Sequence, residues 1–98
     1  MNDELDAIVR NVNIMQQYRD AKARHPGMLL LFRMGDFYEL FDADAETAAK
    51  VLGLTVTRRE KNPYESSAMA GFPKASLEAY LRKLIGAKHR VAICEEVL

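Results

Sequence analysis

Two short apolar runs near the middle of the chain constrain its fold more than any other feature. Residues 28–32 (Met-Leu-Leu-Leu-Phe) and 37–41 (Phe-Tyr-Glu-Leu-Phe) each have the length of one strand, and Gly35-Asp36 lies between them. A Gly-Asp pair permits the tight primed turn that joins adjacent antiparallel strands. The two runs therefore predict a β-hairpin.

An amphipathic segment precedes this hairpin. Apolar residues recur every three or four positions over residues 3–24, which predicts a helix. Asn11 and Asn13 are candidate caps for a second helix inside the segment, so residues 1–13 are expected to add an extra N-terminal helix. The sequence His-Pro-Gly at residues 25–27 ends the helical part, because proline disfavours helix in the residue before it and glycine suits the turn.

Helical and strand-like segments alternate after the hairpin. Residues 42–52 begin with acids, continue with alanine, valine and leucine, and are followed by Gly53, so they predict a helix whose positive N-terminal end carries acids. Residues 54–57 are typical of a strand. Residues 58–63 are polar, contain a proline and hold the densest cluster of positive charge, which predicts a loop.

The last third of the chain predicts one more helix between two strands. Residues 67–71 are expected to form a short strand, and Ser76 is expected to cap a helix that ends at Gly86. Residues 91–94 are expected to form a buried strand. The order of elements indicates an α/β (α+β) fold, a mixed sheet of about four to six strands flanked by helices, in a single domain over residues 1–98.

Composition sets limits on the function of the chain. Its 98 residues fit one compact domain, and 14 basic residues balance 14 acidic ones, so no global positive field favours nucleic acid and any DNA contact must come from a local patch. The single cysteine, Cys94, has apolar neighbours and indicates a buried, reduced thiol in a cytoplasmic protein. Secretion and membrane spanning are not expected, because the first residues lack the positive region and apolar core of a signal peptide and no apolar run approaches ~20 residues.

The sequence gives no sign of an enzyme. It lacks a phosphate-binding loop and a dinucleotide fingerprint, so nucleotide hydrolysis is not expected. Asp42, Asp44 and Glu46, together with Asp36 and Glu39, permit a second interpretation as the metal site of a nuclease. Acids are commonplace at helix starts, and no lysine has a suitable catalytic spacing. The expectation is therefore that no metal or cofactor is bound.

The second strand of the hairpin carries the most informative chemistry. Side chains alternate along a strand, so Phe37, Glu39 and Phe41 are expected on one face, with Tyr38 and Leu40 on the other. One interpretation places Phe37 in the core and Glu39 at a solvated edge. The other makes Phe37 an exposed apolar wedge beside a hydrogen-bonding group, as in proteins that unstack a base step. The alternating pattern fits both interpretations.

Several motifs in register resemble the opening domain of the MutS family of DNA mismatch repair proteins, over roughly residues 14–96. They occur in the family's order: Met15-Gln16-Gln17-Tyr18, His25-Pro26, the run Leu30 to Phe41 with Gly-Asp-Phe-Tyr-Glu at its centre, Ala68-Met69-Ala70-Gly71, and Arg90 to Glu95. The resemblance implies a MutS N-terminal domain-like fold. It also implies mismatched, double-stranded DNA as the partner.

The resemblance implies roles for individual residues as well. Phe37 would stack into the duplex from the minor groove at a mispaired or unpaired base, and Glu39 would hydrogen-bond that base. Three further residues would lie near the minor groove: Met34, Asp36 and Met69. Three basic residues would meet phosphates: Arg58, Arg59 and Lys61.

The chain also departs from the family pattern. Pro73-Lys74-Ala75 replaces the usual Pro-Tyr-His. The connector, lever, clamp and ATPase domains of the full-length family, and the ATP binding that goes with them, are not expected within these 98 residues. The chain is therefore expected to depend on other subunits or domains for encircling DNA and signalling repair. The alternative is a stand-alone protein-interaction or structural module, for example from a mobile element, that keeps the fold without mismatch repair activity.

Overall fold

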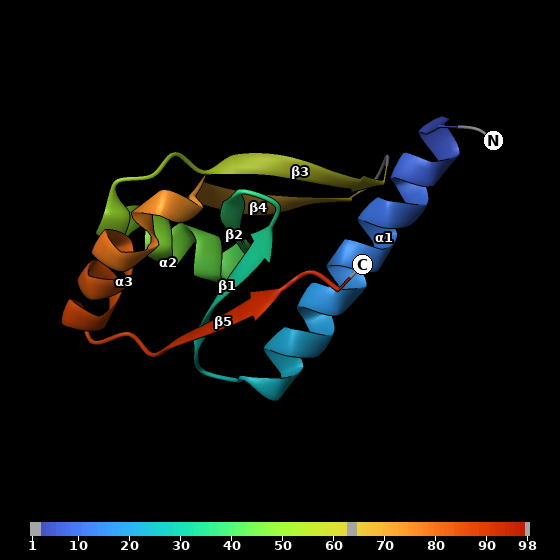
Figure 1. Ribbon diagram of the computed structural model, residues 1–98. Coiled ribbons are helices and arrows are strands. Elements are labelled where there is room, and N and C mark those ends of the chain that lie inside the picture. The colour runs from blue at the N-terminus through green and yellow to red at the C-terminus, as the bar shows by residue number, and fades with distance from the viewer. Residues whose placement is uncertain (1–2, 63–64, 98) are drawn as a thin grey trace.

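The computed structural model describes residues 3–62 and 65–97 (Figure 1). In chain order the elements are α1 (Asp3–Arg24), β1 (Leu29–Met34), β2 (Phe37–Phe41), α2 (Asp42–Leu52), β3 (Thr57–Asn62), β4 (Glu65–Pro73), the 3-10 turn η1 (Lys74–Ser76), α3 (Leu77–Gly86) and β5 (Val91–Glu95). None of the helices in these two stretches is long and apolar enough to cross a membrane.

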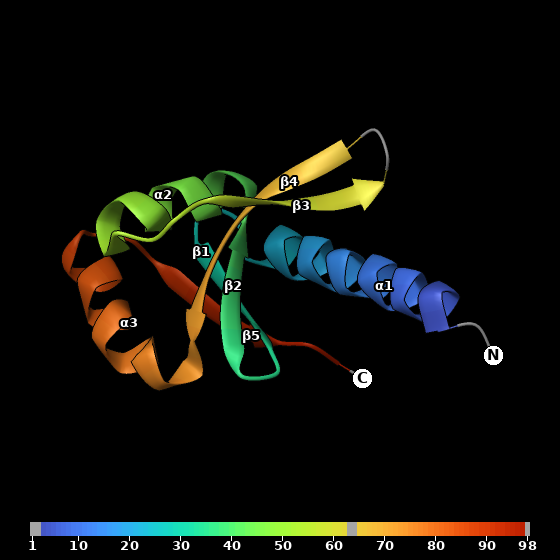
Figure 2. The same ribbon diagram turned by 90° about the horizontal axis from the view of Figure 1, so that it is seen from above.

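The strands form one five-stranded sheet in the order β3-β4-β2-β1-β5. The pairs β1–β2, β2–β4 and β3–β4 are antiparallel, whereas β1 and β5 are parallel. Figures 1 and 2 show α1 on one face of the sheet and α2 with α3 on the other. The fold is a mixed sheet flanked by helices, which confirms the α+β class and the strand number expected from the sequence.

The predicted hairpin is present and tight. Met34 of β1 pairs with Phe37 of β2, which leaves only Gly35 and Asp36 in the loop. Gly35 has a φ of 62°, in the left-handed region that glycine adopts without steric cost, and Asp36 does not. A positive φ at the first central residue alone matches the type II′ hairpin turn, whose twist suits the flanking strands.

Two apolar clusters, one on each face of the sheet, hold the helices in place. The cluster under α1 contains Ile14, Met15, Tyr18, Ala21, Leu30, Phe32 and Phe41. The cluster under α2 and α3 contains Leu29, Leu31, Tyr38, Leu40, Ala45, Ala48, Ala49, Leu52, Ala70, Phe72 and Leu84. Alternate residues of β1 and β2 belong to different clusters, so the centre of the sheet is covered on both faces.

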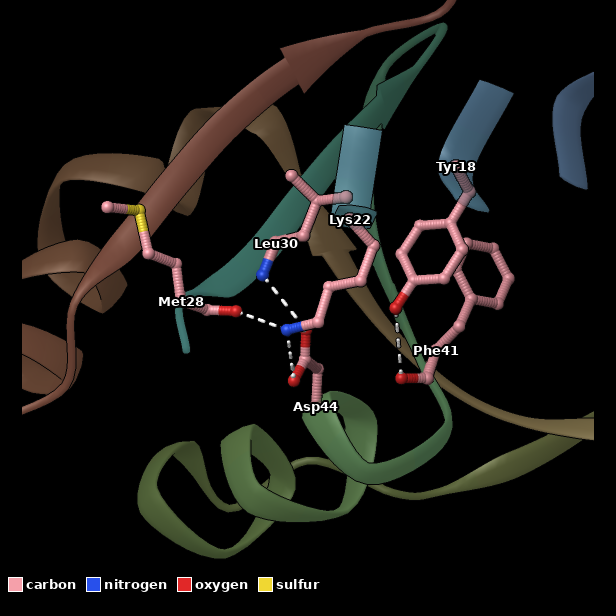
Figure 3. Close-up of polar contacts among 6 residues, drawn as sticks. All are labelled: Tyr18, Lys22, Met28, Leu30, Phe41 and Asp44. Carbon is pink, nitrogen blue, oxygen red and sulfur yellow. Dashed lines mark hydrogen bonds and ion pairs between the residues drawn. The ribbon is translucent and has the colours of Figure 1, made fainter. Parts of the chain in front are cut away.

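Polar contacts fasten α1 to the rest of the domain (Figure 3). The Nζ atom of Lys22 lies 2.8 Å from Oδ2 of Asp44 at the start of α2, and it also donates to the carbonyl of Met28. The same carboxylate accepts a hydrogen bond from the backbone N–H of Leu30 at 3.1 Å. Asp44 therefore links α1, β1 and α2, although the sequence predicted only an acid at a helix start.

The structure corrects the expected strands in the middle of the chain. Residues 58–62, expected to be a loop, belong to β3, whereas residues 54–56 precede that strand. Pairing with β4 outweighs the weak strand preference of Arg-Arg-Glu-Lys-Asn, since β3 is an edge strand whose outer side meets solvent. Strand β4 extends over Glu65–Pro73, beyond the short segment that was expected.

Smaller corrections concern the helices. Helix α1 runs without a break through Asn11 and Asn13, so neither residue begins a second helix. Ser76 makes no side-chain capping hydrogen bond, because η1 leads directly into α3. Gly86 is the last helical residue of α3, but the residue with positive φ after it is Lys88, at 71°.

The last strand also differs from its expected burial. Strand β5 lies at an edge of the sheet, and Ile93 is 45% exposed on it. Cys94 is half-buried against the cluster under α1 and forms no disulfide. The apolar run in β5 pairs with β1 on one side only, with Val91 packed against the cluster under α2 and α3 and Ala92 and Cys94 packed against the cluster under α1.

Candidate nucleic-acid interface

Phe37 is the first residue of β2 and presents its ring to solvent. Phe37 is 47% exposed, whereas Tyr38, the next residue, is buried in the cluster under α2 and α3. Its cross-strand neighbours are Met34 on β1 and Pro73 on β4. An exposed phenylalanine flanked by apolar neighbours at the end of a sheet fits the wedge interpretation, and the exposure rules out the interpretation in which Phe37 packs inward.

The turn that carries Phe37 is anchored on both sides. The backbone N–H of Lys74 donates to the carbonyl of Asp36 at 2.7 Å, and Nε of Arg33 donates to the carbonyl of Gly35 at 3.2 Å. Lys74 also forms an exposed ion pair with Asp36, 3.3 Å between Nζ and Oδ1, which contributes little to stability. These contacts tie the turn that carries Phe37 to β1 and to the segment that follows β4.

Glu39 lies two residues further along β2, on the same face as Phe37. That spacing corresponds to about 7 Å along a strand. Glu39 pairs with Phe32 on β1 and with Gly71 on β4, and its Oε2 atom is closed off from solvent. The carboxylate therefore lies against the sheet surface and is only partly open, beside the exposed Phe37 ring.

The face shared by these two residues is covered at one end only. Phe41, the third residue on this side of β2, is fully buried under α1 and contacts Tyr18 with ring centroids 4.8 Å apart. Helix α1 does not extend over the end of this face near the turn, where Phe37 is exposed. The predicted alternation of Phe37, Glu39 and Phe41 is confirmed, and α1 marks the border between core and accessible surface.

The other residues near the minor groove in the family-based prediction fall into two groups. Met34 and Asp36 lie beside Phe37, the first across the hairpin and the second in the turn. Met69 lies at the far end of the same face, opposite Phe41, and packs against the cluster under α1. The structure thus brings Met34 and Asp36 together with Phe37, and places Met69 beyond Glu39.

Among the predicted phosphate contacts, Arg58 has a described side chain, and it is not adjacent to Phe37. Arg58 is exposed on edge strand β3 and pairs with Ala68, while Phe37 pairs with Pro73, five residues further along β4. Five residues of strand span about 17 Å. Ala68 belongs to the face opposite to that of Glu39, so Arg58 lies at a distance from the pair. The side chains of Arg59 and Lys61 lie outside the described residues.

The alternative metal site finds no support in the part of the chain that the structure describes. No three acidic, histidine or cysteine side chains of those residues gather closely enough to hold a metal ion. Asp44 is already engaged by Lys22 and by the Leu30 N–H. Asp44, the buried acid of the motif, therefore has a structural role.

Two residues near the site gained importance only from the structure. Gly71 lies directly beneath the Glu39 carboxylate, and Lys74 ties the β1–β2 turn to β4. A glycine inside a strand is a sequence signal for close approach of another group, so Gly71 was detectable in principle. Lys74 stood out only as a departure from the family pattern, and its contact with Asp36 depends on how β2 and β4 are paired.

Comparison with known proteins gives a consistent result. The model of the family described as MutS domain I matches residues 12–98. The chain is 48% identical over 91 residues to the DNA mismatch repair protein MutS of Rhodopseudomonas palustris, covering 93% of this chain and 10% of that protein. It is 52% identical to that of Salinibacter ruber and 55% identical to that of Rhodopirellula baltica, each over 84 residues, 86% of this chain and 9% of theirs. The chain thus spans about a tenth of the length of these curated relatives.

Proposed function

Because the chain belongs to the MutS family through its domain I, we propose that it is a DNA-binding module that recognises mispaired or unpaired bases and small loops in double-stranded DNA. Phe37 inserts at the lesion from the minor groove, and Glu39 hydrogen-bonds the displaced base. The observation that carries this proposal is the exposed Phe37 ring on an anchored turn, with Glu39 beside it on the same face.

Selectivity in this mechanism comes from the deformability of the DNA. Inserting an apolar side chain between paired bases costs a few kcal/mol of unstacking. A mismatched step is already poorly stacked and bends more easily, so the same insertion costs less there. Phe37 can therefore discriminate between mismatched and paired steps without making a sequence-specific contact.

Glu39 supplies a second source of discrimination. A carboxylate near the DNA backbone lies in the negative potential of the phosphates, which opposes binding to any duplex. A hydrogen bond to a displaced base offsets this cost, and such a base is available only at a lesion. Glu39 therefore penalises matched DNA more than mismatched DNA.

Binding by this chain alone is expected to be weak. Its 14 basic and 14 acidic residues give no net charge, so few phosphates are neutralised. The dissociation constant for matched duplex should fall in the range of non-specific binders, about 10⁻⁴ to 10⁻⁶ M. In longer relatives, other domains or subunits would add the remaining affinity.

The test compares a matched duplex with one that differs by a single mismatch, using fluorescence anisotropy at low salt. The wild-type chain should prefer the mismatch, and Phe37→Ala should lower mismatch affinity to about the matched level. Ile85→Ala is the control, since Ile85 is an apolar residue on α3, away from the turn, that is 55% exposed against 47% for Phe37. It should leave both affinities unchanged.

The melting temperature of Phe37→Ala separates this mechanism from the alternatives. A half-exposed ring should cost much less stability than the ~3–5 kcal/mol lost when a buried phenylalanine is truncated. Equal affinity of the wild type for both duplexes would contradict mismatch recognition, and absence of binding would favour the protein-interaction module. Cleavage of the DNA with magnesium or manganese would indicate a nuclease.

A further inference from the structure

Gly71 and Glu39 are cross-strand partners in the antiparallel pair of β4 and β2, which lie side by side in the sheet (Figure 2). A Cβ atom added to Gly71 would lie 2.3 Å from Oε2, 2.5 Å from Cδ and 2.6 Å from Oε1 of Glu39. All three distances are shorter than Cβ atoms show in proteins. The Glu39 carboxylate thus occupies the space in which any other residue at position 71 would place its side chain.

Backbone conformation does not account for a glycine at this position. Gly27, Gly35 and Gly53 have positive φ angles between 62° and 79°, which explains their identity. Gly71 lies inside strand β4 and has no such angle. What distinguishes Gly71 is the close approach of another group, which is the second common reason for a glycine within a strand.

The Glu39 carboxylate lies directly over the backbone of Gly71, and we call this position its seat. Phe32, the cross-strand partner of Glu39 on β1, is 1% exposed, and Phe41, on the same face of β2, is fully buried beneath α1. Ordinary contact with a carbon atom begins at 3.4 Å, so a methyl group at position 71 would force the carboxylate to retreat by about 1 Å or to swing to another rotamer. The strands would keep their pairing, since only the end of a flexible side chain must move.

We propose that Gly71 is a positioning residue that sets the specificity of the site by seating the Glu39 carboxylate against β4. This inference rests on the proposed function, in which Glu39 hydrogen-bonds a displaced base. Such a bond requires donor and acceptor within about 2.7–3.2 Å. A carboxylate displaced by 1 Å or more relative to Phe37 misses that window, although Phe37 itself remains in place.

The test uses four variants of the full chain: Gly71→Ala, Glu39→Ala, the double variant, and Gly86→Ala. The last is the matched control, because a Cβ at Gly86 meets nothing within 4 Å and its φ is not positive. The position of the carboxylate is read from the side-chain ¹³C signal of Glu39 in the free protein. Discrimination is read as the ratio of dissociation constants for matched and single-mismatch duplexes.

Gly71→Ala should shift the Glu39 signal and lower the ratio several-fold, to that of Glu39→Ala. In the Glu39→Ala background the same glycine substitution should change the ratio no further, while Gly86→Ala should keep the wild-type signal and ratio. If Gly71→Ala failed to fold, rescue of folding by Glu39→Ala would support the seat, and failure of rescue would overturn it.

Two results would overturn the inference: an unmoved Glu39 signal in Gly71→Ala, or an equal loss of discrimination in the Glu39→Ala background. A different pattern identifies failure of the proposed function. In that pattern the Glu39 signal moves in Gly71→Ala as expected, but the wild type and Glu39→Ala have the same ratio of dissociation constants for matched and mismatched duplexes. The seat would then stand as a structural feature, without a role of Glu39 in reading the base.

Discussion

Lys22 on α1 and Asp44 on α2 form an ion pair, 2.8 Å between Nζ and Oδ2, that joins two helices lying on opposite faces of the sheet (Figure 3). The carboxylate is nearly buried and also accepts the N–H of Leu30, and the ammonium group reaches the carbonyl of Met28. One pair therefore satisfies polar groups of β1 and of the segment that leads into it. It also fixes α1, which covers part of the face that carries Glu39.

Asp44→Ala is expected to destabilise the domain by about 2–4 kcal/mol. It leaves the Leu30 N–H buried without its acceptor and the Lys22 ammonium without its counter-ion. The free energy of unfolding, measured by urea titration, gives the size of the effect. The slope of the titration should not change if the folded state stays compact.

Glu46→Ala is the matched control for that experiment. Glu46 is an exposed acid two residues further along α2, so its removal changes the net charge equally. It should cost well under 1 kcal/mol. Equal losses for the two variants would mean that Asp44 acts only as an acid near a helix start, as its sequence position suggested.

Alkaline pH should destabilise the protein through Tyr18. Burial raises the pKa of the Tyr18 phenol well above its usual range, and the charges of Asp44 and Asp42 raise it further. Above about pH 10 the unfolded chain therefore loses a proton that the folded chain keeps, so stability is complete below that pH and falls as pH rises. The expected decrease in unfolding free energy approaches about 1.4 kcal/mol per pH unit.

Tyr18→Phe provides the check on this slope. The hydroxyl makes only a 3.5 Å contact with the carbonyl of Phe41, so the variant should unfold at nearly the wild-type urea concentration at pH 7. Between pH 10 and 11.5 the wild type should lose stability relative to the variant. Parallel curves for both proteins over this range would refute the assignment to Tyr18.

The elements predicted well from sequence are those with a local apolar pattern. The hairpin of β1 and β2, helix α2 with Gly53 after it, and helix α3 each carry their own periodicity. Strand β3 was missed because its charged residues have low strand preference and gain their conformation from pairing with β4. The Lys22–Asp44 pair left no signal, since its partners are separated by 22 residues.

The candidate site shows the same division. Alternation along β2 was enough to place Phe37 and Glu39 on one face, because the period of a strand is fixed. Whether these residues are core or surface depends on which part of the face α1 packs against. That packing is a tertiary contact and cannot be read from the pattern of β2 alone. The seat formed by Gly71 depends on the register between β2 and β4, which no local pattern encodes.

Arg58 tests whether the β3–β4 hairpin meets DNA. Arg58 is exposed at the sheet edge, about 17 Å along the strand direction from Phe37, which is less than one turn of duplex. Arg58→Ala should weaken binding to matched and mismatched duplexes alike. It should also lower the slope of log affinity against log salt concentration by about one, the value for one lost phosphate contact. Anisotropy titrations at several salt concentrations measure both effects.

Arg82→Ala is the control for the loss of charge, because Arg82 is an exposed arginine on α3 that pairs with Glu78. It should alter the salt dependence much less than Arg58→Ala. If both substitutions acted equally, the β3–β4 hairpin would have no special part in binding. A selective loss of mismatch binding in Arg58→Ala would instead assign this residue to lesion reading.

Glu39→Gln is expected to separate the two effects of the carboxylate on DNA binding. The substitution removes the negative charge and keeps the shape, so repulsion by the phosphates falls for every duplex. The charge-assisted hydrogen bond to a displaced base, which is stronger than a neutral one, is lost only at the lesion. The affinity for matched DNA should therefore stay the same or rise. The affinity for mismatched DNA should fall towards the affinity for matched DNA.

The control is Glu78→Gln, which removes the same charge from an exposed position on α3. Any rise in matched affinity that follows merely from net charge will appear in both variants, and the ratio of the two dissociation constants will change only in Glu39→Gln. Loss of affinity for both duplexes together with a lower melting temperature would mean that Glu39 supports the sheet. In that case the partly buried carboxylate would serve the packing of β2 against β4, and base recognition would fall to Phe37 alone.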